Sequence, residues 1–506
     1  MSRINTNVNS LLAQRILGQQ NLSLNKSLER LSTGFRINRG ADDPAGLIAS
    51  ENLRSEKASI TAAIGNAERA DQVVNIAEGG LQEINSLLLE VQGLVGASAN
   101  EAGLSAEEKK ANQLQIDSIL QTIDRIASAT SFQGTKLLNG SFDFTTSAQA
   151  TTVAGFQINA AKLEGTDHRD VQVLVTQSAQ HAALVLSTGG IQLDLSASTA
   201  NFQFELTGLL GSREFTFASG TTLTDIASSI NTFKSITGVS AIAPGTSAIV
   251  FKSTGFGSDE FVSVKISDSG GQAGVFTTMS ATDENTFSTV AANVQTIAAV
   301  LAAGNGGKRD DGQNVGAIIN GIAATSEGKA ARIVSDFLDV SLDLTTAGAQ
   351  TLGSISALTI TGGGAKFNLG PNVDIQNQVS IGISNVASRN LGSLTNGYLD
   401  DLGSSKTANV VDGNLELGQK IVNDAITQVS SLRGRLGAFQ KNIVGATIRS
   451  LGVALENTSA AESSIRDTDF ATETAELTRS QILVNAATNV LAISNSQPQS
   501  VLSLLG

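Results

Sequence analysis

Few residues of this 506-residue chain could perform chemistry. Cysteine is absent, which excludes disulfides, thiol catalysis and cysteine-based metal sites. The two histidines, His168 and His181, lack ligand spacing to each other or to a helical carboxylate pair, and no His-Glu-x-x-His motif occurs. We therefore expect two surface histidines, no catalytic residue, no metal site and no cofactor.

One glycine-rich segment is the remaining candidate for a small-ligand site. Residues 304–309 (GNGGKR) partly match a phosphate-binding loop, but no Ser or Thr follows Lys308 and the first glycine is misplaced. Asp310 and Asp311 could hold a cation, although a solvated turn is the simpler expectation. Nothing in these residues favours an enzyme, and the sequence favours a structural protein.

Composition and charge exclude further classes. The chain has 33 Lys+Arg against 46 Asp+Glu, a net charge of −13, which argues against binding nucleic acid. The N-terminus has no signal-peptide core, and no run of about 18 apolar residues occurs, so we expect no membrane insertion. A cytoplasmic protein would fit these features, and so would one exported without a cleavable signal.

The distribution of phenylalanine divides the chain into ends and middle. Fifteen of the 19 phenylalanines lie between Phe142 and Phe367. Short apolar runs broken by Gly, Ser and Thr make this middle region read as strands, whereas the ends have a helical composition. We therefore predict an α+β fold, in which both chain ends form a long helical coiled-coil bundle and the insert is mainly β.

Heptad periodicity is the strongest pattern in the sequence. From Ile60 to Val95, every position reached by alternating steps of three and four residues is apolar, and the same holds from Val422 to Ala446. A third run follows a capping box at Ser105 and Glu108. We expect one helical bundle, whose bundle seam includes Ile60, Val74, Leu81, Ile84, Leu88, Val91, Val422, Val429, Leu432, Leu436, Phe439 and Ile443.

The outermost segments carry narrower apolar stripes. Fixing the backbone costs about 1–2 kcal/mol per residue, and a buried Leu or Val returns about 1.5–3 kcal/mol, so a lone terminal helix is unstable. We predict that both termini are mobile in the free monomer and fold by pairing within an assembly. The terminal seam consists of Ile4, Val8, Leu11, Leu17, Leu24, Leu28, Leu31, Phe35, Phe470, Leu477, Val484 and Leu491.

A break separates the outer helices from the inner ones. Gly40 interrupts the helical pattern, and Asp43 followed by Pro44 makes a good N-cap and first residue for the next helix. We expect a hinge at Gly40, Asp43 and Pro44. Several helical glycines, among them Gly79 and Gly80, miss the bundle seam. They lie either on a solvated face or where another subunit approaches closely.

Motifs at both chain ends resemble those of bacterial flagellin. The N-terminal set comprises INTNVNSLLAQRIL, SLERLSTGFRINRGADDPAGLIASENLRSE, AERADQVVNIAEGGLQEINSLL and SFQGTKLLNG. The C-terminal set comprises SSLRGRLGAFQKN and the final ENTSAAESSIRDTDFATETAELTRSQILVNAATNVLAISNSQPQSVLSLLG. The resemblance implies a structural subunit that self-assembles into the flagellar filament used for swimming motility. It also implies secretion through the flagellum's own channel to the extracellular flagellum.

The resemblance also implies domains and partners. Residues 1–43 plus 465–506 would form an inner-tube coiled-coil domain, 44–145 plus 366–464 an outer-tube helical bundle with a β-hairpin, and 146–365 a variable outer region. Residues 213–268 resemble a small module of flagellins and filament-cap proteins, and residues 365–383 resemble the hairpin of the outer tube. The implied partners are copies of the chain, the flagellar export apparatus and an export chaperone, the filament cap and the hook–filament junction proteins.

One departure from the family pattern concerns the toll-like receptor that senses flagellin. In sensed flagellins, the segment matching residues 87–95 carries an Arg and a Glu, and a further acidic contact follows. Here Glu90 and Gly93 take the first two positions and Gln115 the third. Reversing a charge at an interface centre weakens binding strongly, so we expect poor receptor activation.

Two alternatives to a filament subunit remain open at this point. A hook–filament junction protein has similar ends, and a cytoplasmic coiled-coil scaffold would share the periodicity. The long insert and the close match at both termini favour the filament subunit.

Overall fold

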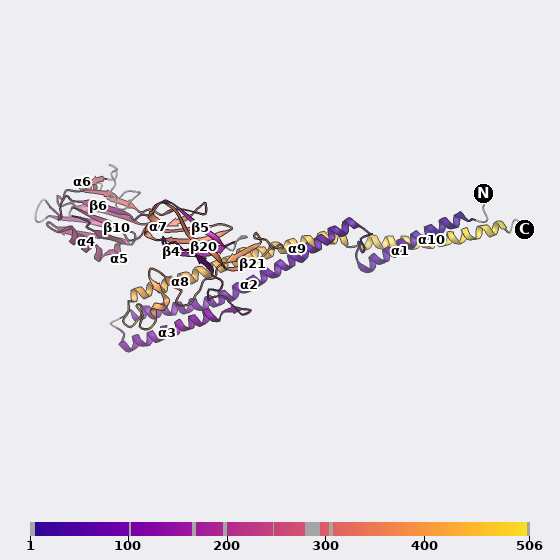
Figure 1. Cartoon of the computed structure of the whole chain (residues 1–506), viewed down its shortest axis with the longest axis horizontal. Helices are drawn as coiled ribbons and strands as arrows, with labels where there is room; N and C mark the ends of the chain where they lie inside the picture. The colour runs from indigo at the N-terminus through magenta and orange to yellow at the C-terminus, as the bar shows by residue number, and fades with distance from the viewer. Residues whose placement is uncertain are drawn as a thin grey trace. The chain divides into compact units, whose positions relative to one another are not determined.

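The computed structural model describes residues 6–100, 103–163, 168–195, 200–245, 247–278, 294–302 and 307–502. Long helices at both ends of the sequence flank a mainly β middle region, which confirms the predicted α+β fold (Figure 1). The chain divides into two compact units, one of Met1–Gln72, Phe367–Asn377 and Gly437–Gly506, the other of Val73–Lys366 and Gln378–Leu436. These limits differ from those of the three expected domains, whose boundaries stay a prediction.

The first unit is helical. Helices α1 (Val8–Thr33) and α10 (Phe470–Leu502) run side by side, and α9 (Gly445–Arg466) precedes α10 (Figure 1). Helix α2 (Pro44–Ser98) begins here, and the carboxylate of Asp43 accepts a hydrogen bond from the Gly46 N–H at 2.9 Å. The predicted N-cap and first residue of α2 are therefore confirmed.

A π-helical turn, η4 (Phe439–Val444), joins α8 (Leu415–Ala438) to α9. The Phe439 ring packs on Phe367, with 5.9 Å between the ring centroids. Strands β21 (Ala365–Asn368) and β22 (Gln378–Ile381) lie within the segment predicted as a hairpin, and the Leu369 N–H donates to the Asn377 carbonyl at 2.9 Å.

The long helices of the second unit are the rest of α2, α3 (Ala106–Ala129) and most of α8. The predicted capping box of Ser105 and Glu108 begins α3. Arg433 donates to Glu78 at 2.8 Å and Gln92 to Asn423 at 2.7 Å, so polar contacts join α2 to α8. The short elements are β1 (Ser131–Phe132), β2 (Thr135–Lys136), β23 (Gly392–Ser393), β24 (Gly397–Tyr398) and η3 (Leu399–Leu402).

The β region of this unit has two hydrophobic cores. An aliphatic module has sheets of order β16-β15-β5-β20-β3 and β17-β18-β19-β4, around a core of mainly Val, Ile, Leu and Ala. Its elements are β3 (Phe144–Ser147), β4 (Val153–Ala161), β5 (Arg169–Gln177), β15 (Gly316–Ile319), β16 (Ile322–Ala323), β17 (Thr325–Glu327), β18 (Ala330–Val334), β19 (Leu338–Leu344), α7 (Thr346–Gln350) and β20 (Gly353–Gly363).

A Phe-rich module is inserted between β5 and β15. Its sheets have the order β13-β12-β6-β10-β9 and β14-β11-β7-β8. Its elements are β6 (Ala183–Ser187), β7 (Asn201–Gly208), β8 (Gly211–Ala218), α4 (Leu223–Thr232), α5 (Lys234–Thr237), β9 (Val239–Ile242), β10 (Ala248–Ser253), β11 (Phe261–Asp268), β12 (Val275–Thr278), β13 (Val294–Thr296), α6 (Ile297–Ala302) and β14 (Lys308–Asp311).

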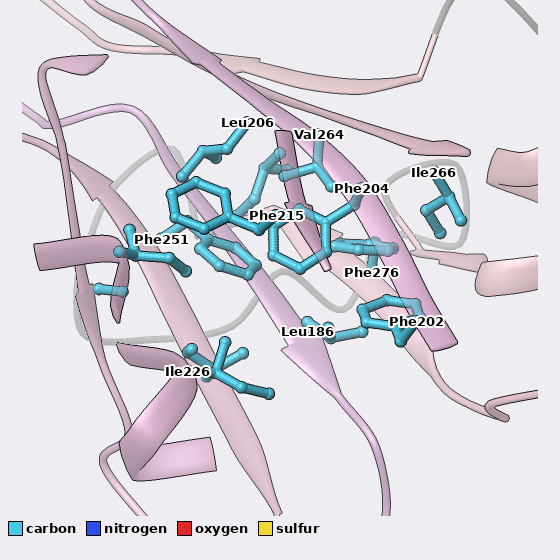
Figure 2. Close-up of a cluster of buried hydrophobic side chains, with 14 of the residues drawn as sticks. Leu186, Phe202, Phe204, Leu206, Phe215, Ile226, Phe251, Val264, Ile266 and Phe276 are labelled. Carbon is cyan, nitrogen blue, oxygen red and sulfur yellow. The ribbon is translucent and has the colours of Figure 1, made fainter. Parts of the chain in front are cut away.

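Alternating strand residues fill the core of the Phe-rich module. On β7, Phe202, Phe204 and Leu206 point inward, because side chains of one strand alternate between the two faces. Figure 2 shows Phe204 among Phe215 and Phe251, and each of these two rings lies 5.9 Å from it between centroids. The order strand, helix, strand, strand predicted for residues 213–268 is present, with β9 as an additional strand.

Three sequence expectations need correction or limits. Asp310 and Asp311 lie in strand β14 rather than in a solvated turn. His181 is half-buried, packs against Phe256 with 3.7 Å between the ring centroids and the ring planes tilted by 38°, and places Nδ1 2.9 Å from the Gly255 carbonyl oxygen. His168 is exposed, whereas Gly304 and its two successors lie outside the described residues.

Among the described helices, none has the length and hydropathy needed to cross a membrane.

Candidate assembly surface

Helices α1 and α10 meet along a narrow interface. Its positions alternate in steps of three and four residues, and about half of them are small or polar. On α10 these buried or half-buried residues are Glu473, Leu477, Ser480, Val484, Ala487, Leu491 and Ser494, and on α1 they include Ser10, Ala13, Leu17, Leu24, Ser27 and Leu31. Small residues at such positions let two helices approach closely, but they bury little apolar surface.

Polar contacts fix an antiparallel register between these helices. The Asn7 side chain donates to the Ser494 carbonyl at 2.6 Å, and the Ser10 hydroxyl donates to Asn495 at 2.7 Å. At the other end of the pair, Arg30 contacts Glu473 at 3.4 Å. The pair therefore joins residues near the two ends of the sequence.

The predicted terminal seam is distributed over two sides of this pair. Leu17, Leu24, Leu31, Leu477, Val484 and Leu491 are half-buried and lie in register with the interface. Val8, Leu11, Leu28, Phe35 and Phe470 are exposed, from 38% at Phe35 to 61% at Val8. Ile4 lies outside the described residues. A two-helix contact covers one side of each helix only, so the remaining apolar residues stay uncovered.

Further apolar residues add to this uncovered surface. The large exposed apolar residues of α1 and α10 together are named the exposed terminal face. They are Val8, Leu11, Leu12, Ile16, Leu22, Leu28, Phe470, Ile482, Leu483, Val490 and Ile493. A cavity of about 210 Å³ opens among Ile16, Leu483 and Val490, beside the small residues of the pair. Large exposed apolar patches on a protein mark interaction surfaces.

The turn between α1 and α2 is held by hydrogen bonds to the end of α9 and to the link between α9 and α10. The Arg36 N–H donates to the Arg466 carbonyl at 2.7 Å, and the Thr468 N–H donates to the Gly34 carbonyl at 2.9 Å. The Arg466 guanidinium lies over the Phe35 ring, 4.7 Å from its centroid. Gly34 has φ +75°, the left-handed conformation that favours glycine at a helix end.

Charges stabilise the same turn. A hydrogen bond from Lys26, together with the N–H groups of Arg39 and Asn38, holds the pKa of Asp42 below its usual value. Asp43 caps α2. Gly40 and Pro44 border this fastened turn, and a hinge movement there stays a prediction.

The structure buries eleven of the twelve residues named for the bundle seam. Ile443 is the exception, since 39% of its surface is exposed. The π-turn η4 adds a residue to the helical turn, which shifts the register so that Val444 takes the buried place assigned to Ile443. Heptad counting from Phe439 therefore gives the wrong residue at this point.

Glycine positions in the bundle helices separate into two kinds. A Cβ at Gly65, Gly79, Gly93, Gly434 or Gly437 would meet no atom within 4 Å. At Gly80 it would lie 2.8 Å from a side-chain atom of Leu138 and of Thr130. Gly80 therefore serves packing inside the chain, whereas the others border open space in the single subunit.

The residues singled out for receptor recognition lie on helix surfaces. Glu90 and Gly93 are exposed on α2, and Gln115 is exposed on α3. Sequence reasoning missed the polar and small interface residues Ser10, Glu473, Ser480 and Ser494. On α10, a second heptad register displaced by three residues from Leu477 and Val484 could have found Glu473, Ser480 and Ser494. On α1, Ser10 continues the seven-residue spacing of Leu17 and Leu24.

These features define a class of protein before any comparison. Both chain ends are long helices that pair with each other, and the paired helices leave apolar surface uncovered. Chains of this class are structural subunits that assemble with copies of themselves.

Comparisons with known proteins agree with this class. Residues 4–143 match the bacterial flagellin N-terminal helical region, residues 419–505 the C-terminal helical region, and residues 201–255 the flagellin hook IN motif. The flagellin of Salmonella muenchen is 30% identical over 530 residues, covering 99% of each chain. Flagellin B of Vibrio cholerae is 28% identical over 503 residues, again covering 99% of each chain.

The solved structures are less similar in sequence to this chain than these flagellins are. FliC from Burkholderia pseudomallei is 15% identical with a TM-score of 0.23, covering 74% of this chain and 99% of its own. The hook-associated protein-3 from Legionella pneumophila is 12% identical with a TM-score of 0.28, covering 81% and 97%. Such TM-scores support no argument from overall fold.

The chain belongs to the bacterial flagellin family. It is a structural subunit of the bacterial flagellar filament, and the alternative role in the hook–filament junction is not favoured.

Proposed function

We propose that the exposed terminal face carries the contacts between subunits in the filament. The observation that supports this assignment is the uncovered apolar side of α1 and α10. About half of the residues in their mutual interface are small or polar, so it stabilises the pair only weakly. Folding of the chain ends is then coupled to assembly, because only neighbouring copies supply the missing apolar burial.

A point substitution tests the assignment of this face. Leu22 is 71% exposed on α1, and its burial against another subunit is worth about 1.5–3 kcal/mol. L22Q should therefore raise the critical concentration for seeded filament growth by about 10- to 100-fold. The matched control N21Q changes an exposed polar neighbour and should polymerise as the parent does. An unchanged critical concentration for L22Q would remove Leu22 from the interface.

Truncation tests the role of the paired ends as a whole. Removing residues 1–35 or 470–506 should leave a folded middle region that does not polymerise. Hydrogen exchange on dilute monomer should show fast-exchanging amides in α1 and α10, and slow exchange in the assembled filament. Slow exchange in the monomer would contradict coupled folding.

We further propose the setting that the family resemblance implies. The subunit is exported to the extracellular flagellum with the help of the export apparatus and a chaperone, and it meets the filament cap and hook–filament junction proteins during growth. It performs no catalysis. Mass identification of the subunit in sheared extracellular filaments tests this setting, and its retention in the cytoplasm would favour a scaffold instead.

Weak activation of the flagellin-sensing receptor is also a proposal. Glu90 and Gly93 present neither the cation nor the acid expected at their positions, and Gln115 is neutral. Purified monomer should signal poorly in a reporter-cell assay. G93E, which supplies one missing acid, should improve the response, and potent signalling by the unmodified monomer would refute the argument.

A further inference from the structure

A polar cavity of about 310 Å³ lies beside the last turn of α8, in the second unit. Its wall combines Arg435 of α8, Gln157 of β4, Asp143 and the loop residues 384–391. Neither the terminal face nor the proposed subunit contacts involve this cavity. Its lining is rich in amide, hydroxyl and charged groups, of which Gln157 and Asn390 are exposed and Arg435 is half-buried.

Arg435 is the cation in the lining of this cavity, and one edge of its guanidinium is unused. Nη1 donates to Asn159 Oδ1 on β4. Nε and Nη2 are buried and have no acceptor among the described residues. These two nitrogens form one edge of the planar guanidinium, the edge that pairs with two oxygens of a single carboxylate or phosphate.

The rest of the wall supplies further donors. Asn385 accepts a hydrogen bond from the Ala387 N–H at 3.0 Å through its side-chain oxygen, which leaves its amide nitrogen to donate. Within the part of the chain that the structure describes, the side chains of Gln157, Ser384 and Asn390 make no hydrogen bond to protein. Amide and hydroxyl groups of this kind suit the polar body of an organic ligand.

Asp143 is the carboxyl group in the lining of this cavity. Burial raises its pKa, although a hydrogen bond from the Phe144 N–H opposes that shift. The charge of Arg435, which lines the same cavity, opposes the rise in pKa as well, but within the described residues no ion pair joins the two groups. An acid that is more easily protonated than usual can remain beside a bound anion at low cost.

We propose that this cavity binds a small organic oxyanion, a carboxylate with a hydroxyl- or amide-bearing body, through the free edge of Arg435. The volume favours an organic ion over a bare inorganic one, because a water molecule takes up only about 30 Å³ of liquid. The bound ion bridges α8, β4 and the loop 384–391. It thereby strengthens the attachment of the β insert to the bundle helices.

Titration calorimetry on the full-length monomer tests the proposal, with citrate, phosphate and chloride compared at equal ionic strength. Citrate should bind saturably and more tightly than phosphate, and chloride should not bind. R435Q should weaken citrate binding at least about tenfold, whereas R433Q, which removes a cation of the same helix outside the cavity, should not. D143N should bind citrate at least as tightly as the parent.

Three results would overturn the proposal. They are the absence of saturable citrate binding, equal affinity in R435Q, or citrate that binds no more tightly than phosphate. If R435Q does not fold, the Arg435 Nε resonance of the parent chain replaces it as the probe. That resonance should shift on adding citrate, and an unchanged resonance at saturating citrate overturns the proposal as well.

Discussion

The carboxyl group of Asp310 should make the Phe-rich module more stable in mild acid. Asp310 Oδ2 accepts a hydrogen bond from the Ala183 N–H at 2.8 Å, which connects β14 to the first residue of β6. Burial raises the pKa of Asp310 from 3.8 to about 6, and the nearby charge of Asp311 adds to this rise. The folded chain therefore takes up this proton at a higher pH than the unfolded chain.

The direction and size of the effect follow from this difference. A carboxyl whose pKa is higher in the folded state adds stability as the pH falls through about 6, and the gain is complete below 3.8. The full pKa difference corresponds to about 3 kcal/mol. The gain between pH 7.5 and 4.5 is smaller than this full difference, and Asp310 keeps partial contact with solvent, so we expect about 1–2 kcal/mol in that window.

Asp310→Asn removes the titration and can keep the hydrogen bond from Ala183. The variant should be more stable than the parent at pH 7.5 and should lose most of the pH dependence. Burial also raises the pKa of Glu260, so a smaller dependence of the same sign should remain. Differential scanning calorimetry of monomer at both pH values measures the effect, and carboxyl carbon shifts report the pKa directly.

Asp311→Asn is the matched control. Asp311 lies on the same strand, is exposed and pairs with Arg309 at 2.6 Å. Its loss removes a smaller cause of the raised pKa of Asp310 and should leave most of the pH dependence in place, because burial is the main cause. A pKa of Asp310 near 4, or equal pH dependence in the parent and D310N, would refute the reasoning.

Three further predictions concern the helices. Gly79→Ala should stabilise the monomer by about 0.5–1 kcal/mol in a urea titration, because its Cβ enters open space. Gly80→Ala should destabilise the monomer in the same titration, and a stability change of the same sign in both variants would contradict the packing at Gly80. Asp43→Ala should cost about 1 kcal/mol by removing the N-cap of α2, with loss of its first-turn exchange protection as the readout. Lys26→Met should bring the pKa of Asp42 back toward 3.8 in a carboxyl titration, and an unchanged pKa would exclude this ion pair in solution.

The bundle could be predicted from sequence because its heptad pattern is local and continuous. Every seam position from Ile60 to Val95 is apolar, and each of these residues is buried. The pattern failed at Ile443 because a π-turn adds one residue without a signal in the hydrophobic period. The sequence does not reveal such a shift of the heptad register when both candidate residues, here Ile443 and Val444, are aliphatic.

The buried polar residues of the β region could not be predicted in this way. Asp310 and Arg435 are ordinary surface types in sequence, and their burial depends on strands that lie far away along the chain. Ala183 reaches Asp310, and Asn159 reaches Arg435, across 127 and 276 residues respectively. No local pattern encodes such distances, so the candidate oxyanion site had no sequence signal.

The interface of the terminal helices could be predicted in part, less well than the bundle and better than the buried polar residues. Their leucines predict a seam, yet the residues that α1 and α10 share include Ser10, Ser480 and Ser494, while Leu22 and Ile493 face away. A helix selected for stability within one chain would turn its largest apolar residues toward its partner. About half of the positions between α1 and α10 are instead small or polar, so we propose that other subunits supply much of the apolar burial of these helices. Under this proposal, the free energy that orders the chain ends depends on subunit concentration, because their folding is part of assembly.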